Sequence, residues 1–193
     1  MNIDTNLIRH SLLAGFLIGI GVIINIMTGD RVLGSVYFSF GLLTIICFDL
    51  KLFTGKVGNF QNYKFSELWD MYLWNCVGCS AAMLFYLLSN PQFGEYLIPI
   101  AEAKFDKSFI ELFFAGILCG ALVHLAVKSK NVFITIAAIS IFILVGAEHC
   151  VADWPFAWFY TKNHDAVITG LKYLSIIIGN SIGAIGTEFF LKK

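Results

Sequence analysis

Apolar residues in this chain gather into six runs that short polar connections separate. Each run is close to the length that an α-helix needs to cross a hydrocarbon layer about 30 Å thick. The runs cover residues 11–27, 32–53, 71–88, 109–127, 132–152 and 167–191. The pattern predicts an all-α membrane protein with six transmembrane helices.

Composition makes lipid the expected outer solvent. Hydrophobic residues form 58% of the 193 residues and charged residues 13%, too little charge to cover a soluble body that holds 19 Phe. The 13 basic residues are balanced by 13 acidic ones, so the chain lacks the net positive charge typical of proteins that bind nucleic acid. We expect one compact domain over residues 1–193, with the lipid bilayer as a partner and no nucleic acid.

Basic residues in the connections predict the orientation, because Lys and Arg are enriched on the cytoplasmic side of membrane proteins. With the N-terminus inside, the inner connections hold seven such residues: Arg9, Lys56, Lys64, Lys128, Lys130, Lys192 and Lys193. The outer connections hold four: Arg31, Lys104, Lys107 and Lys162. Both termini are therefore expected in the cytoplasm.

The two halves of the chain, about residues 1–95 and 96–193, share short motifs. The matching pairs are AGFLIG with AGILCG, at residues 14–19 and 115–120, and NCVG with NSIG, at residues 75–78 and 180–183. Each half holds three spans, an odd number, so a duplicated unit crosses the membrane in opposite directions. The sequence thus predicts an inverted 3+3 repeat. Its glycines, spaced three or four residues apart, are typical of helices whose backbones approach closely.

Polar residues interrupt the second and fifth runs at matching points. The second run is apolar from residue 32 to 48 and then meets Asp49 and Lys51. The fifth is apolar from residue 132 to 147, then meets Glu148 and His149, and is expected to end at Pro155. Broken helices near the midplane of inverted-repeat transporters line a cavity, and we expect the same of these two interruptions.

His149 is the first candidate for function. An ionisable ring beside Glu148 after a long uncharged run is costly in a membrane unless it is paired or wetted. Imidazole titrates near neutrality, so the ring can hold or donate a proton as charge passes. The other interpretation, an interfacial histidine with Glu148 as its structural partner, stays open.

Other candidates also carry two interpretations. The Thr54 hydroxyl suits a hydrogen bond to a small anion or a pore histidine, or it belongs to an ordinary helix end. Lys104 attracts anions to an outer mouth, or it pairs with Asp106. Phe53 and Phe156 form hydrophobic constrictions, or they belong to the aromatic belt at the membrane surface.

Neither a metal nor a cofactor is expected. Cys76 and Cys79 have CxxC spacing, but the apolar residues around them indicate one face of a buried helix. His124 lies in the middle of the fourth run. It is interpreted as a packing residue with an interhelical hydrogen bond, with a second proton relay as the alternative.

The motifs resemble those of a known family. LFTG at residues 52–55, AGILC at 115–119, EHCVAD at 148–153 and GNSIG at 179–183 stand in the order and spacing of the formate/nitrite transporter family. The resemblance covers nearly all of the chain. It implies an aquaporin-like protomer with broken second and fifth helices, assembled as a homopentamer in the inner, or cytoplasmic, membrane with one pore per protomer.

The resemblance also implies roles for single residues. His149 matches the central pore histidine, Thr54 the threonine that faces it, and Asn180 a polar neighbour from the sixth span. Lys104 matches a lysine that raises the local positive potential, while Phe53 and Phe156 lie near the constrictions. Three positions depart from the family pattern: Gly120 and Asp153, where asparagine is common, and Lys128, where an aromatic residue is common.

These residues predict a proton-linked channel for small monovalent weak-acid anions. A bare anion loses far more hydration energy in a hydrophobic constriction than its neutral acid does. Lys104 is expected to attract the anion, and a proton to reach it at or near His149, with Thr54 and Asn180 orienting ring and substrate. Formate is the preferred substrate, with nitrite and hydrosulfide as alternatives and a neutral-solute pore for water or urea as another. An enzyme is not expected, because no catalytic constellation is present in the sequence.

Overall fold

The computed structural model describes residues 4–192 as an array of helices, and no strand occurs among them. In chain order the helices are α1 (Thr5–Met27), α2 (Arg31–Cys47), α3 (Phe53–Lys56), the 3-10 helix η1 (Val57–Asn62), α4 (Phe65–Ser89), the 3-10 helix η2 (Pro91–Phe93), α5 (Gly94–Phe105), α6 (Phe109–Ser129), α7 (Val132–Leu144), α8 (Cys150–Tyr160) and α9 (Ala166–Leu191). Lys193, which the charge count assigns to the inner side, lies outside the described residues.

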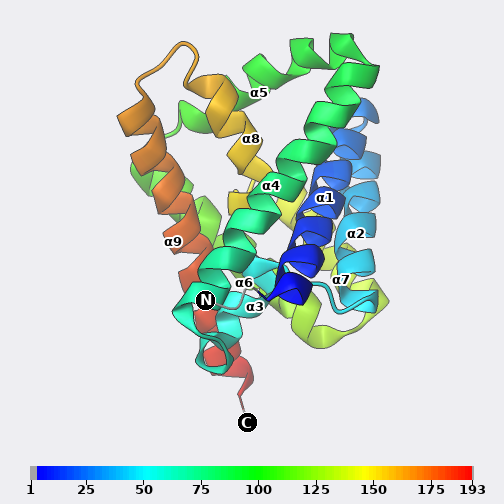
Figure 1. The fold of residues 1–193 in the computed structure, drawn as a ribbon, viewed down its shortest axis with the longest axis vertical. Coiled ribbons are helices and arrows are strands. Elements are labelled where there is room, and N and C mark those ends of the chain that lie inside the picture. The colour runs from blue at the N-terminus through cyan, green and yellow to red at the C-terminus, as the bar shows by residue number, and fades with distance from the viewer. Residues whose placement is uncertain (1–3, 193) are drawn as a thin grey trace.

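Four helices are long and apolar enough to cross a membrane: α1, α4, α6 and α9. Two shorter apolar helices, α2 and α7, have 17 and 13 residues, fewer than the roughly 20 that a full crossing needs. Most of these helices run along the long axis of the molecule, and both termini lie towards the same end (Figure 1). α5 crosses the opposite end. The prediction of an all-α fold with long apolar helices is confirmed for residues 4–192, whereas the six crossings and the inverted repeat stay predictions.

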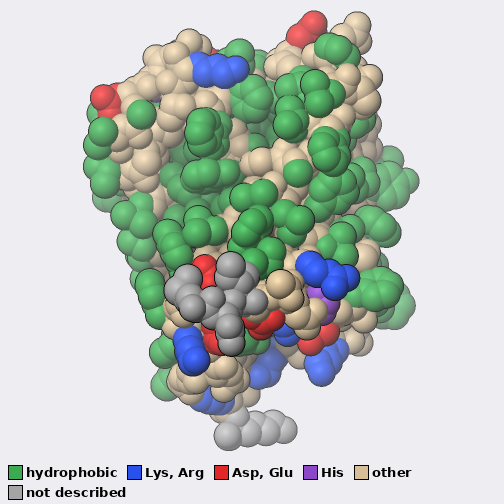
Figure 2. All heavy atoms as spheres, in the orientation of Figure 1, with side chains coloured by type: hydrophobic (Ala, Val, Ile, Leu, Met, Phe, Trp, Pro, Cys, Tyr) green, Lys and Arg blue, Asp and Glu red, His purple; other side chains and the backbone are tan. Residues whose placement is uncertain are grey.

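The distribution of side chains on the surface fits a protein embedded in lipid. Hydrophobic side chains cover the middle of the face shown in Figure 2, whereas Lys, Arg, Asp and Glu gather at the end that holds the termini, with a few at the opposite end. Large apolar side chains such as Phe40, Phe133 and Leu174 are exposed along the helices. In water such a surface would favour aggregation, so its exposure fits a protein whose surroundings are lipid or other apolar protein surfaces.

Glycines allow two helix pairs to pack in backbone contact. α1 packs along α4, and α6 packs along α9. A Cβ atom at Gly120 would lie 2.8 Å from the Cα of Asn180, and one at Gly19 would lie 2.7 Å from the Cβ of Ala82. Real side chains do not approach that closely, so both contacts require a residue without a side chain.

The chain breaks where polar residues interrupt the second and fifth runs. After α2 the left-handed residue is Asp49, with φ of 45°, and after α7 it is Gly146, with φ of 71°. In each case the next residue donates a backbone hydrogen bond to the carbonyl five positions back, at 2.9 and 3.0 Å. This motif ends a helix by satisfying its last carbonyls. The next helices, α3 and α8, begin four residues after the left-handed residue in each case.

One expectation about this region was wrong. Pro155 does not end the fifth run, because it lies inside α8, which continues to Tyr160. The missing N–H of a proline removes one helical hydrogen bond, yet α8, which packs against α4 and α5, continues past it. The stretch around Lys104 lies between α4 and α6, as the expected connection does, and is itself helical, because Lys104 is in the last turn of α5.

We predict that Gly120→Ala destabilises the protein by about 1–3 kcal/mol, because the new methyl group forces α6 away from α9. The measurement is thermal or denaturant unfolding in detergent. Gly170→Ala in α9 is the matched control, because nothing lies within 4 Å of a Cβ atom there. Equal stability of the two variants would contradict the role assigned to this contact.

Candidate functional site

Asn180 holds both sides of the break before α8. Its side-chain oxygen accepts a hydrogen bond from the backbone N–H of Cys150 at 2.9 Å. Its side-chain nitrogen donates to the carbonyls of Gly116 and Glu148, at 2.9 and 2.8 Å. The amide, fully buried on α9, thereby satisfies backbone groups on either side of His149 that the broken helix leaves without partners.

Asn75 does the same at the break before α3. Its side-chain oxygen accepts from the backbone N–H of Phe53 at 2.8 Å. Its nitrogen donates to the carbonyls of Ser11 and Lys51, at 2.7 and 2.8 Å. Sequence reasoning noticed Asn75 only as part of a repeated motif and assigned it no role. Its match to Asn180 in that motif was the available signal.

His149 is the N-cap of α8, and both of its ring nitrogens have partners. Nδ1 accepts hydrogen bonds from the backbone N–H groups of Val151 and Ala152, each at 3.2 Å. A nitrogen that accepts carries no hydrogen, so the hydrogen-bond network assigns the ring proton to Nε2. Nε2 lies 2.9 Å from the Thr54 hydroxyl and donates to it. Helix break, ring and threonine therefore form one buried unit that joins α3 to α8.

Two lysines and two carboxylates meet beside this unit. Lys104 Nζ lies 2.5 Å from Glu148 Oε2 and 2.8 Å from Asp153 Oδ1. Lys107 Nζ lies 2.5 Å from Glu148 Oε1. The carboxylates are 1% and 2% exposed, whereas the lysine side chains are 25% and 33% exposed. The cluster, hereafter the charge cluster, is neutral when all four groups are ionised.

The charge cluster borders a cavity of about 220 Å³, hereafter the chamber. Lys104, His149, Asp153 and Phe156 line it, together with apolar residues of α1, α2, α5 and α7. Lys104 lies 5.8 Å above the centre of the Phe156 ring. A small chamber with one polar wall and several apolar walls is typical of a binding site for a small solute.

Not all candidate residues meet at the chamber. Phe53 is buried against Tyr72 and lines a separate, mostly apolar cavity. Gly120 lies in the α6–α9 contact. Lys107 binds Glu148, a contact that the sequence did not predict. Nothing in the sequence of a connection between helices indicates which of its side chains turns inward.

His124 belongs to another polar group near the termini. Its Nε2 lies 2.9 Å from Glu188 Oε2 on α9, and Lys128 Nζ lies 2.9 Å from Glu188 Oε1. This is the kind of interhelical contact that the packing interpretation of His124 expected. Lys128 takes part in it, which accounts for a charge at a position where the family commonly has an aromatic residue.

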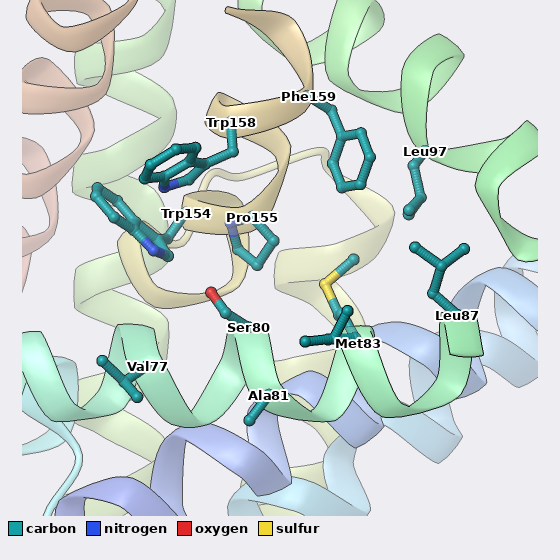
Figure 3. A pocket seen from close by; sticks show the side chains of 11 residues that line it. Val77, Ser80, Ala81, Met83, Leu87, Leu97, Trp154, Pro155, Trp158 and Phe159 are labelled. Atoms are coloured by element: carbon teal, nitrogen blue, oxygen red, sulfur yellow. The ribbon is translucent and has the colours of Figure 1, made fainter. Parts of the chain in front are cut away.

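A larger cavity, of about 700 Å³, lies between α4 and α8. Figure 3 shows that Trp154, Pro155 and Trp158 face Val77 and Met83 across it. Its lining residues, all among residues 4–192, carry no charge, so this cavity lacks the cation that an anion site needs to offset the loss of hydration. Within residues 4–192, no group of three or more His, Cys, Asp or Glu side chains is placed to hold a metal ion.

Sequence comparison relates the chain to known transporters. The family model described as formate/nitrite transporter matches residues 3–190. The formate channel FocA of Haemophilus influenzae is 30% identical over 146 residues, which cover 64% of this chain and 51% of FocA. FocA of Escherichia coli K12 is 27% identical over the same shares. The chain thus spans about half the length of these formate channels. The uncharacterized transporter YwcJ of Bacillus subtilis is 28% identical, covering 91% of this chain and 82% of YwcJ.

Structural comparison identifies the same fold in solved channels. A pentameric formate channel with formate bound superposes with a TM-score of 0.77 at 21% identity, covering 96% of this chain and 95% of the channel. A channel described as an FNT family ion channel superposes with a TM-score of 0.81 at 22% identity, covering 96% and 90%.

We predict that Glu148→Gln destabilises the protein by about 3 kcal/mol, because it leaves Lys104 and Lys107 facing each other without a full counter-charge between them. Unfolding in detergent measures the change. Glu111→Gln is the control, since Glu111 is an exposed capping residue of α6 and glutamine also fits that position. A loss no larger for Glu148→Gln than for the control would rule out a structural role for the charge cluster.

Proposed function

The chain belongs to the formate/nitrite transporter family, and from that membership we propose that it is a proton-linked channel for small monovalent weak-acid anions, with formate as the preferred substrate. The observation that carries the proposal is the chamber, because Lys104 and Asp153 of the charge cluster and His149 of the His149–Thr54 pair line one small cavity. Membership in a family of transporters also favours transport over enzymatic activity.

The proposed architecture is one channel domain with six membrane crossings, related as an inverted 3+3 repeat in an aquaporin-like protomer. It is supported by the matching breaks after α2 and α7 and by the matching bonds of Asn75 and Asn180. The protein is an integral membrane protein. We place it in the cytoplasmic membrane with both termini in the cytoplasm, as the count of basic residues favours, and as a homopentamer, like the similar formate channel.

Desolvation sets the mechanism. A formate ion that enters the chamber exchanges bulk water for the apolar walls around Phe142 and Phe156. Lys104 and Lys107, which are partly exposed, attract the anion to the mouth and replace part of its hydration. Protonation then removes the charge, and the neutral acid crosses the apolar part of the pore at a far lower free energy.

The His149–Thr54 pair closes the inner side of this path. The ring holds its Nε2 proton towards Thr54, and the threonine hydroxyl in turn can donate to an oxygen of the substrate. Asn180 keeps the ring in place through the peptide groups on either side of it. In this proposal the pair orients the acid and passes it inward, and the proton is released on the far side of the membrane.

Formate is preferred because FocA and the pentameric channel of the same fold are formate channels. Nitrite and hydrosulfide are also small conjugate bases of weak acids and suit the same chamber. A neutral-solute pore for water or urea is the competing function. The two are distinguished by flux, because neutral solutes cross at a rate that depends neither on pH nor on Lys104.

We expect purified protein in liposomes to take up labelled formate faster at the more acidic of two external pH values, with weaker or comparable uptake of nitrite and hydrosulfide. His149→Phe is expected to abolish the pH-dependent part, because a phenyl ring neither caps α8 nor reaches Thr54 with a donor. His164→Phe is the control, since His164 is exposed and stacks on Tyr160. Unchanged pH-dependent uptake in a folded His149→Phe protein would overturn the proposal.

Thr54 provides a second test with a built-in control. Thr54→Val keeps the shape but removes the hydroxyl, which leaves the buried Nε2 donor of His149 without its partner, whereas Thr54→Ser keeps the bond. We expect formate uptake to fall about tenfold or more in the valine variant, equivalent to about 1.4 kcal/mol in the barrier, and to stay near wild type in the serine variant. Equal rates for valine and serine would show that the hydroxyl has no part in transport.

A further inference from the structure

One oxygen of Asp153 has no partner, although it is buried. Oδ1 lies 2.8 Å from Lys104 Nζ, but among residues 4–192 no group forms a hydrogen bond to Oδ2. The side chain is 2% exposed and lines the chamber. A buried polar atom without a hydrogen bond costs about 1–3 kcal/mol, so an unpaired carboxylate oxygen at a cavity calls for a functional role or for a partner from outside the protein.

The other titratable groups at the chamber are already bonded within the protein. Both oxygens of Glu148 bind lysines, and both nitrogens of His149 are engaged, one by the helix start and one by Thr54. The remaining polar or ionisable groups that lie near Asp153 or line the chamber are Lys104 from α5, Cys79 from α4, Cys119 from α6, Cys150 from α8 and the amide of Asn25 from α1. A thiol is a much weaker acid than a carboxyl group, and an amide does not release a proton near neutral pH. These side chains are therefore poor proton donors to a small carboxylate.

The protonation of Asp153 changes the charge of the whole charge cluster. With both carboxylates ionised, Lys104 and Lys107 are balanced and the cluster has no net charge. With a proton on Asp153, the same cluster carries a charge of +1 and attracts an anion into the chamber. Anion entry and the presence of a transferable proton therefore occur in the same state of the protein.

We propose that Asp153 is the proton-exchange group of the chamber, with Oδ2 as the atom that gives its proton to an entering small carboxylate or similar weak-acid anion. The inference rests on the proposed transport function and names the residue that supplies its proton. It also explains why a carboxylate stands where the family commonly has asparagine, since an amide cannot release a proton at neutral pH.

The transfer balances without any further reactant. The O–H bond of the Asp153 carboxyl group breaks, its electron pair stays on Oδ2, and a new O–H bond forms on the anion. The products are the neutral acid and a carboxylate whose other oxygen Lys104 already holds. The cluster then has no net charge and no further attraction for the acid. Water on the side where the two lysines are exposed returns a proton to Oδ2.

Asp153→Asn tests the inference, because the amide keeps the size of the side chain and an oxygen for Lys104 but has no exchangeable acid proton. We expect formate uptake into liposomes at acidic external pH to fall about tenfold or more, and its dependence on pH to flatten. The control is Asp165→Asn, the same chemical change at the exposed N-cap of α9, where asparagine caps equally well. A wild-type pH profile in folded Asp153→Asn would overturn the inference while leaving the proposed function intact.

Infrared difference spectroscopy provides a readout that does not need transport. Formate added to the wild-type protein should remove the C=O stretching band of a buried carboxylic acid and produce a carboxylate band. Both changes should be absent in Asp153→Asn and present in Asp165→Asn. If the wild type shows no such band, or if the band persists in Asp153→Asn, the inference is wrong. If the wild type takes up neither formate nor nitrite nor hydrosulfide but still shows the infrared change, the result would count against the proposed function alone.

Discussion

The site depends on the three hydrogen bonds of one buried amide, that of Asn180. A helix broken inside a membrane exposes carbonyl and N–H groups that lipid cannot satisfy, so a break persists only where protein groups replace water. Asn180 binds the carbonyl of Glu148 and the N–H of Cys150, the two peptide groups that flank His149. The ring is thus held from the backbone on both sides. Its own Nδ1 then supplies the cap for α8, so a single residue both starts the helix and faces Thr54.

Electrostatics imposes the second constraint. Glu148 and Asp153 are almost fully buried, and a buried carboxylate is tolerated only when cations lie beside it. When both carboxylates are ionised, Lys104 alone would leave a net negative charge at the entrance of an anion path. Lys107 restores neutrality by binding the free oxygen of Glu148, which allows Lys104 to divide its contacts between the two carboxylates. Asp153 thus adds one negative charge where the family commonly has a neutral asparagine, and Lys107 adds one positive charge that offsets it.

The sequence predicts the helices and the breaks well because both follow from local chemistry: long apolar runs form spans, and charges that interrupt them end helices. It predicts contacts less well. The motifs AGFLIG and AGILCG align Gly15 with Gly116, yet Gly15 contacts Asn75 in the way that Gly120 contacts Asn180, one helical turn further on. Because the glycines of each motif are four residues apart, Gly15 can be aligned with Gly116 or with Gly120. Only the packing of the helices decides between the two alignments. Lys107 and the helical state of α5 were missed for the same reason, since both depend on what the connection packs against.

The two breaks also show how a similar backbone serves different chemistry. Leu52 occupies at the first break the place that His149 occupies at the second, three residues after the left-handed residue and directly before the next helix. Leu52 is buried and makes no capping bond, whereas His149 caps its helix and binds Thr54, two residues beyond Leu52. A second imidazole in place of Leu52 would put two ionisable rings close together in a medium of low dielectric, where charging one opposes charging the other. An apolar side chain there leaves a single ring on the path and lets the first half contribute only the neutral hydroxyl that this ring needs.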